Sequence, residues 1–85
     1  MLSLYLAMIE SEEHKLTFEH IYHNYAKQMQ YIANKILQDP YIAEDAVQEA
    51  LFSIARFIDC VPTHTKSATK AYVYIVIRNI SWKML

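Results

Sequence analysis

The 85-residue chain contains no glycine, two prolines and one cysteine. P-loops, dinucleotide-binding fingerprints and two-residue hairpins need glycine, because their backbone takes a positive φ or approaches a phosphate closely. The sequence therefore excludes all three motifs. One cysteine cannot form a disulfide framework or a four-cysteine zinc site, and it favours a reducing compartment.

Apolar residues make up 54% of the chain and charged residues 20%, a composition that excludes intrinsic disorder. At 85 residues the chain is expected to form a single domain, 1–85. A domain of this length buries only about 60–65% of the surface of its unfolded chain. We therefore expect some apolar surface to contact a partner or sequence that is missing from this chain.

The first segment, Met1 to Ile9, is mostly apolar but no lysine or arginine precedes it. It is too short for a membrane span, which needs about 20 apolar residues, and it lacks the positive start of a signal peptide. We expect it to form a short helix packed on the domain of a cytoplasmic protein, with no membrane partner.

Charge divides the chain into an acidic front and a basic back. Residues 1–50 carry eight acidic and three basic side chains, whereas residues 51–85 carry one acidic and five basic ones. This asymmetry favours two different partners, the second a nucleic acid. Chance in a short chain is the alternative explanation.

Apolar residues recur at three- and four-residue steps, a spacing that predicts helices and no strands. Asp39 followed by Pro40 is typical of a helix start. The candidate caps of the other two long helices are hydroxyl residues: Ser11 or Thr17, and Thr65 or Ser67. The predicted fold class is all-α, a compact bundle of three main helices plus a short N-terminal helix, with bounds 1–10, 11–38, 40–59 and 66–85.

Each predicted helix divides into an apolar and a polar face. Phe57 is assigned to the buried face of helix 40–59, and Ser81 to an exposed edge of the last helix. Phe52 is the exception, because the helical wheel places its ring on the polar face. Such an aromatic ring is either tolerated there or a contact residue.

No group of residues has the spacing of a catalytic or metal site. His20 and His23 have no third ligand, so we interpret them as part of a solvated face. Cys60 has no activating base in the sequence and is expected to be a half-buried structural thiol. Carboxylates at the start of helix 40–59 suit the helix dipole. We therefore predict no enzyme, no cofactor and no metal.

The last helix combines aromatic rings with positive charge on both flanks of its core stripe. Such a surface suits single-stranded nucleic acid, because cations offset phosphate charge and each base stacked on a ring contributes about 1–3 kcal/mol. A helix that packs on two sides is the alternative. The residues concerned are Lys70, Tyr72, Tyr74, Arg78, Trp82 and Lys83.

Three segments follow one another in a specific order: FEHIY from Phe18, AEDAVQEA from Ala43 and AYVYIVIRN from Ala71. Together they resemble region 2 of the bacterial sigma-70 family of sigma factors, most of all the small extracytoplasmic-function (ECF) type. The resemblance extends from Phe18 to Met84. Tyr72 stands where the family often has tryptophan, which preserves a stacking ring.

The resemblance implies two partners. In the family, the second long helix docks on the clamp coiled coil of the largest subunit of core RNA polymerase. The residues that this implicates here are Glu44, Asp45, Gln48, Glu49, Phe52 and Arg56.

The second partner that the resemblance implies is promoter DNA. The family's loop and last helix bind and open the −10 promoter element and hold an unstacked base of its non-template strand. The amide of Asn79 can both donate to and accept from a base edge. The residues implicated are Lys66, Lys70, Tyr72, Arg78, Asn79 and Lys83.

The function implied is promoter recognition and melting in transcription initiation, and an anti-sigma protein is a further candidate partner. The helix-turn-helix domain that family members carry is absent from this sequence, so we expect a fragment or isolated domain of a longer factor. Two alternatives remain: a helical protein–protein adaptor, and a transcription regulator that binds duplex DNA.

Overall fold

The computed structural model describes residues 2–85. Their elements are α1 (Leu2–Leu6), α2 (Glu12–Leu37), α3 (Pro40–Arg56), the 3₁₀ helix η1 (Ile58–Cys60) and α4 (Lys66–Met84). No β-strand occurs in this part of the chain. The predicted all-α bundle of three main helices and a short N-terminal helix is confirmed. Met1, which the predicted first helix included, lies outside the described residues.

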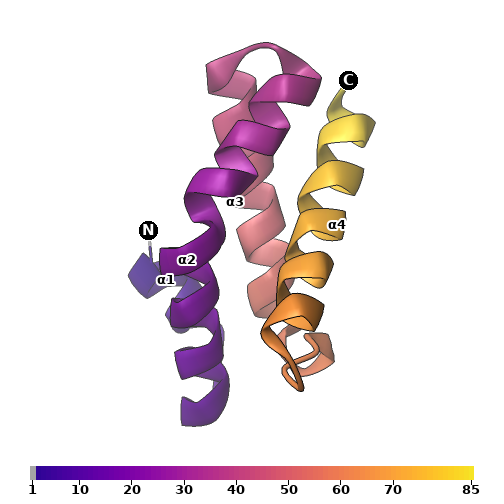
Figure 1. Ribbon diagram of the computed structural model, residues 1–85. Coiled ribbons are helices and arrows are strands. Elements are labelled where there is room, and N and C mark those ends of the chain that lie inside the picture. Colours follow the sequence, from indigo (N-terminus) through magenta and orange to yellow (C-terminus); the bar gives the residue numbers. More distant parts are fainter. Residues whose placement is uncertain (1) are drawn as a thin grey trace.

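The three long helices lie side by side, and each contacts the other two. α2 and α4 run in the same direction and α3 returns between them (Figure 1). α1 packs against α2 and α3. Within residues 2–85, none of the helices is long and apolar enough to cross a membrane.

Two residues, Gln38 and Asp39, connect α2 to α3. Gln38 has a left-handed backbone (φ 55°), and its N–H donates to the carbonyl of Asn34 at 2.8 Å. The Asp39 carboxylate accepts from the backbone N–H groups of Tyr41 and Ile42, at 2.9 and 3.3 Å. Asp39 therefore caps α3 as predicted.

Hydroxyl side chains cap the other two long helices, one from each predicted pair. Ser11 Oγ accepts from the N–H of His14 at 3.3 Å, and Thr65 Oγ1 accepts from the N–H of Ala68 at 3.0 Å. Each bond satisfies a backbone donor that the first turn of a helix leaves unpaired.

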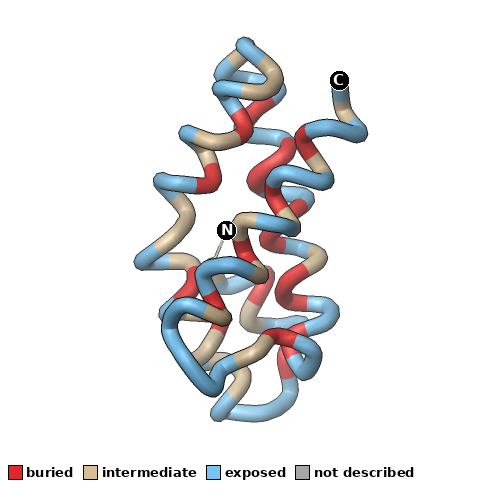
Figure 2. Tube along the Cα trace, turned by 45° about the vertical axis from the view of Figure 1, so that its right-hand side comes forward, coloured by how far each residue is buried: buried red, intermediate tan, exposed pale blue. Residues whose placement is uncertain are grey.

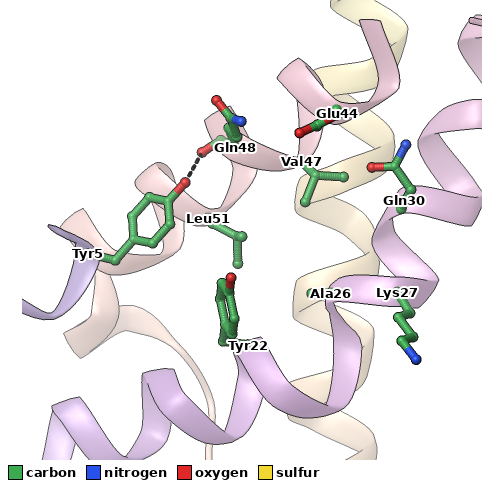
Figure 3. Close-up of a pocket in the computed structure, with 9 residues that line it drawn as sticks. All are labelled: Tyr5, Tyr22, Ala26, Lys27, Gln30, Glu44, Val47, Gln48 and Leu51. Atoms are coloured by element: carbon green, nitrogen blue, oxygen red, sulfur yellow. Dashed lines mark hydrogen bonds between the residues drawn. The ribbon is translucent and has the colours of Figure 1, made fainter. Parts of the chain in front are cut away.

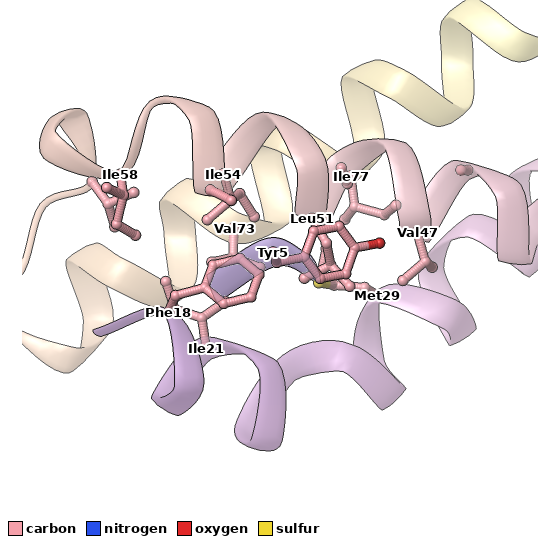
Figure 4. Packing of buried hydrophobic residues seen from close by; sticks show 14 of the residues in the cluster. Tyr5, Phe18, Ile21, Met29, Val47, Leu51, Ile54, Ile58, Val73 and Ile77 are labelled. Carbon is pink, nitrogen blue, oxygen red and sulfur yellow. The ribbon is translucent and has the colours of Figure 1, made fainter. Parts of the chain in front are cut away.

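The core lies between the long helices, and α1 contributes the ring of Tyr5 (Figure 4). The Phe18 side chain is completely buried, and its ring centroid lies 5.5 Å from that of Tyr5 and 6.4 Å from that of Tyr22. Buried positions recur along every long helix (Figure 2). The largest fully buried apolar side chains are Phe18, Ile21, Met29, Ile54, Val73 and Ile77.

α1 is shorter than predicted, because it ends at Leu6 rather than at residue 10. The N–H of Met8 donates to the carbonyl of Tyr5, and that of Ile9 to the carbonyl of Leu6, both at 3.1 Å. These i to i+3 bonds tighten the chain into a turn. Ile9 is left only 4% exposed, so its burial offsets the loss of further helix.

α3 also ends before the predicted residue 59. Phe57 leaves the helical conformation (φ −112°, ψ 35°), and η1 follows it. This change of direction buries Ile58 and turns Phe57 outward, where it is 47% exposed. The prediction that Phe57 belongs to the core is therefore wrong, as is that of a half-buried Cys60, whose side chain is exposed.

Candidate binding surfaces

The outward side of α3 carries acidic and amide side chains around one aromatic ring. Phe52 is 47% exposed among them. The helical repeat places all six residues predicted for this helix on that side, and all of them are exposed. We call them the acidic face: Glu44, Asp45, Gln48, Glu49, Phe52 and Arg56.

Two grooves border the acidic face. One, of about 310 Å³, lies between α2 and α3, and the other, of about 500 Å³, lies between α3 and the N-terminal segment. Both include Tyr5, whose hydroxyl donates to the carbonyl of Gln48 at 3.4 Å (Figure 3). Burial, with a smaller effect of Tyr22, raises the pKa of the Tyr5 hydroxyl. Tyr5 therefore stays a neutral donor and holds α1 beside the acidic face.

One flank of α4 faces α2. The Tyr74 ring meets the ring of Tyr25 on α2 edge to face, with the centroids 6.4 Å apart, and Lys70 Nζ lies 5.5 Å from the Tyr74 centroid. Arg78, one turn further on, is exposed. Ser81 was predicted on this exposed edge but is completely buried. Its hydroxyl is buried and has no hydrogen-bond partner within residues 2–85.

The other flank of α4 begins close to η1, which follows α3. Tyr72 is half-buried there. Burial raises the pKa of its hydroxyl, and the nearby Cys60 and Asp59 raise it further. Asn79 and Lys83 follow on the same flank and are exposed.

The predicted nucleic-acid residues of α4 therefore do not form one cluster, because they divide between these two flanks. Arg78 and Asn79 are adjacent and both exposed, at the outer side where the flanks meet. Ile75 and Trp82 lie on the same side, 54% and 63% exposed. These four residues are the outer ridge of α4. The resemblance had implicated neither Ile75 nor Trp82, although Trp82 was among the aromatic residues singled out in the sequence.

Thr69 ties the preceding loop to α4. Its hydroxyl donates to the carbonyl of Pro62 at 2.6 Å. The carbonyl oxygen of Thr65 lies 3.2 Å from the same hydroxyl oxygen. This contact positions the loop beside Lys66, which lines a groove of about 310 Å³ against the first half of α2. Lys66 thus lies at the loop, away from the outer ridge.

Replacing Thr69 by valine keeps the side-chain shape but removes the donor to Pro62. We expect the free energy of unfolding to fall by about 1–2 kcal/mol, because a partly buried carbonyl loses its partner. Urea unfolding followed by circular dichroism measures this loss. The matched control is Thr63→Val at an exposed loop position, which should change stability by less than about 0.5 kcal/mol. Equal midpoints for both variants would contradict the assigned role.

Within residues 2–85, no group of three or more His, Cys, Asp or Glu side chains is placed to hold a metal ion. His20 and His23 are exposed on α2. The amide nitrogen of Asn24 lies 3.2 Å from His20 Nδ1, so the ring contacts a neighbour one turn away.

One family model matches the part of the chain that carries both surfaces. The family model described as sigma-70 region 2 matches residues 21–84, which include all of α3 and α4. No curated protein and no solved structure gives a significant match. The chain therefore belongs to the sigma-70 region 2 family, the sigma factor domain that acts in promoter recognition and RNA polymerase binding.

Proposed function

We propose that the acidic face binds the clamp coiled coil of core RNA polymerase, and that the outer ridge of α4 and the loop before it hold the melted −10 element. In this proposal the chain is a single ECF-type domain that acts in the cytoplasm. One observation carries the proposal: the aromatic side chain of Phe52 is exposed and is surrounded by acidic and amide side chains.

Phe52 has the surroundings of an interface anchor. An apolar ring that a partner desolvates, enclosed by polar groups that exclude water, is typical of a binding hot spot. Within residues 2–85 the one ion pair joins Lys15 to Glu12, so Asp45 and Glu49 are unpaired inside the chain. These carboxylates favour a basic partner, which they also steer during association.

The outer ridge of α4 offers what an unpaired nucleotide needs. The Arg78 guanidinium offsets phosphate charge, the Trp82 ring is available for stacking, and the Asn79 amide can contact a base edge. The face of a base and its Watson–Crick edge are both accessible only when the base has left the duplex. The same surface therefore holds opened DNA more tightly than closed DNA.

Affinity of the isolated domain for DNA should be low. The chain carries a net charge of −1, and only a few of its cations lie on the outer side of α4. Since phosphate contacts supply most of the non-specific affinity for DNA, binding depends on polymerase bringing the strand to α4.

The test is to form the complex of the 85-residue chain with core RNA polymerase and to measure its affinity for labelled promoter oligonucleotides. We expect the single-stranded non-template −10 element to bind at least about tenfold more tightly than the duplex, and Asn79→Ala to reduce that preference. The control is Lys35→Ala, since Lys35 is exposed on α2 and lines neither groove beside the acidic face. A preference for duplex would support the regulator alternative, and no binding to polymerase would support the adaptor alternative.

A further inference from the structure

The groove of about 500 Å³ beside the acidic face is lined from two separate segments. Leu4 in α1 and Met8 in the turn after it contribute apolar side chains that are 66% and 39% exposed. On the other side, Phe52 contributes its ring from α3. The N-terminal segment was predicted only to pack on the domain, so these two residues belong to neither of the predicted binding sites.

The chemistry of this groove is apolar at its centre and acidic at its border. The lining residues include two carboxylates and no lysine or arginine: Leu4, Tyr5, Met8, Asp45, Gln48, Glu49 and Phe52. Phosphate groups of a nucleic acid would be repelled by Asp45 and Glu49. The groove instead favours a basic partner that also carries an apolar side chain.

The N-terminal side of the groove is held firmly in place. Tyr5 is 6% exposed, its ring contacts Phe18, and its hydroxyl donates to the carbonyl of Gln48. Ile9 is also buried, so the segment is anchored both within α1 and after Met8. Leu4 and Met8 are thus presented from a fixed position, and little entropy is lost when a partner covers them.

We propose that Leu4 and Met8 extend the acidic face into one continuous docking site for a basic amphipathic helix. This inference rests on the proposed function, because its occupant is the polymerase segment that the acidic face binds. Asp45, Gln48, Glu49 and Phe52 belong both to the groove and to the acidic face. A partner that covers the Phe52 ring therefore also covers the groove.

In this arrangement an apolar side chain of the partner helix enters the groove between Leu4, Met8 and Phe52. Basic side chains on either side of it reach Asp45 and Glu49. Knob-like insertion of one side chain between residues of neighbouring elements is how helices pack. The N-terminal segment thereby limits the size and shape of the apolar side chain that the groove can accept.

The experiment compares the wild-type chain with the double variant Leu4→Ser/Met8→Ser for affinity to core RNA polymerase, by fluorescence anisotropy of labelled chain. Removing both apolar contacts should weaken binding by about tenfold. The matched control is Leu85→Ser, because Leu85 is 69% exposed, close to the 66% of Leu4, and lies at the end of α4. Its affinity should equal that of the wild type.

A rescue variant, Leu4→Met/Met8→Leu, separates loss of apolar contact from loss of folding. It should bind like the wild type, and thermal unfolding should show similar midpoints for all three variants. If the rescue variant binds as weakly as the serine variant, the proposed apolar contact with the partner helix is contradicted.

Failure of this inference can be distinguished from failure of the proposed function. Wild-type affinity in the serine variant, with weakened binding in Phe52→Ala, would overturn the inference alone. No binding of the wild-type chain to polymerase would overturn both. Self-association of the wild type in sedimentation, lost in the serine variant, would make a second copy of the chain the occupant and overturn the inference as well.

Discussion

Phe18→Ala is expected to unfold most of the domain at 37 °C. The side chain is completely buried, and its ring lies between those of Tyr5 and Tyr22. Truncating a buried phenylalanine removes about 3–5 kcal/mol from the free energy of unfolding, through lost transfer energy and the cavity that remains. In domains only slightly shorter than this one, the core supplies about 3–5 kcal/mol. The single change therefore removes a large part of the stability.

Thermal unfolding followed by circular dichroism at 222 nm measures this effect, with the helical signal at 37 °C as the direct readout. The matched control is Leu16→Ala, two residues earlier in α2, because Leu16 is 68% exposed. It should change stability by less than about 0.5 kcal/mol. If Phe18→Ala unfolds cooperatively at the same midpoint temperature as Leu16→Ala, the packing of α1 on α2 does not depend on this ring.

The number, order and starts of the long helices could be predicted because local sequence determines them. Asp39 and Pro40 supply a cap and a fixed φ at the start of α3, whatever surrounds them. Ser11 and Thr65 act in the same way at the starts of α2 and α4. Each cap is a contact between residues two or three apart, which a sequence displays directly.

Helix ends depend on tertiary contacts, and the predicted ends of α1 and α3 were wrong. The end of α2 was predicted to within one residue, although the backbone of its cap, Gln38, is left-handed, a conformation that glycine or asparagine usually provides. Phe57 continues the apolar stripe of α3, yet burial of Ile58 in η1 turns it outward. Helical periodicity alone does not show that Ile58, rather than Phe57, is the residue that becomes buried.

The two predicted surfaces differed in how far the sequence could define them. α3 has one wide buried face, so its wheel placed the whole acidic face correctly on the exposed side. α4 packs against both α2 and α3. Its apolar stripe is narrow, so the helical wheel did not show which residues beside the stripe are exposed and which are buried. Leu4 and Met8 were missed because the turn after Leu6 decides where Met8 lies.

Phe52→Ala is expected to weaken binding to core RNA polymerase by about 30-fold, which corresponds to about 2 kcal/mol. The ring lies at the border shared by the acidic face and the groove that contains Leu4 and Met8. Its loss would leave the partner's apolar side chain without its aromatic contact and would admit water beside Asp45 and Glu49. Hot-spot truncations of this kind act mainly by speeding dissociation. Biolayer interferometry with immobilised core polymerase measures the affinity and both rate constants.

Phe57→Ala is the matched control, because it removes the same ring from a position just after α3 that is also 47% exposed. The Phe57 ring contacts the Arg56 guanidinium, with Cζ 5.2 Å from its centroid, and it does not line the groove. Its loss should change affinity by less than about threefold, since most interface-rim side chains contribute little. If the two variants lose affinity equally, the effect is a general one of exposed aromatic surface. If neither loses affinity, Phe52 is a tolerated surface ring and polymerase binds elsewhere on the domain.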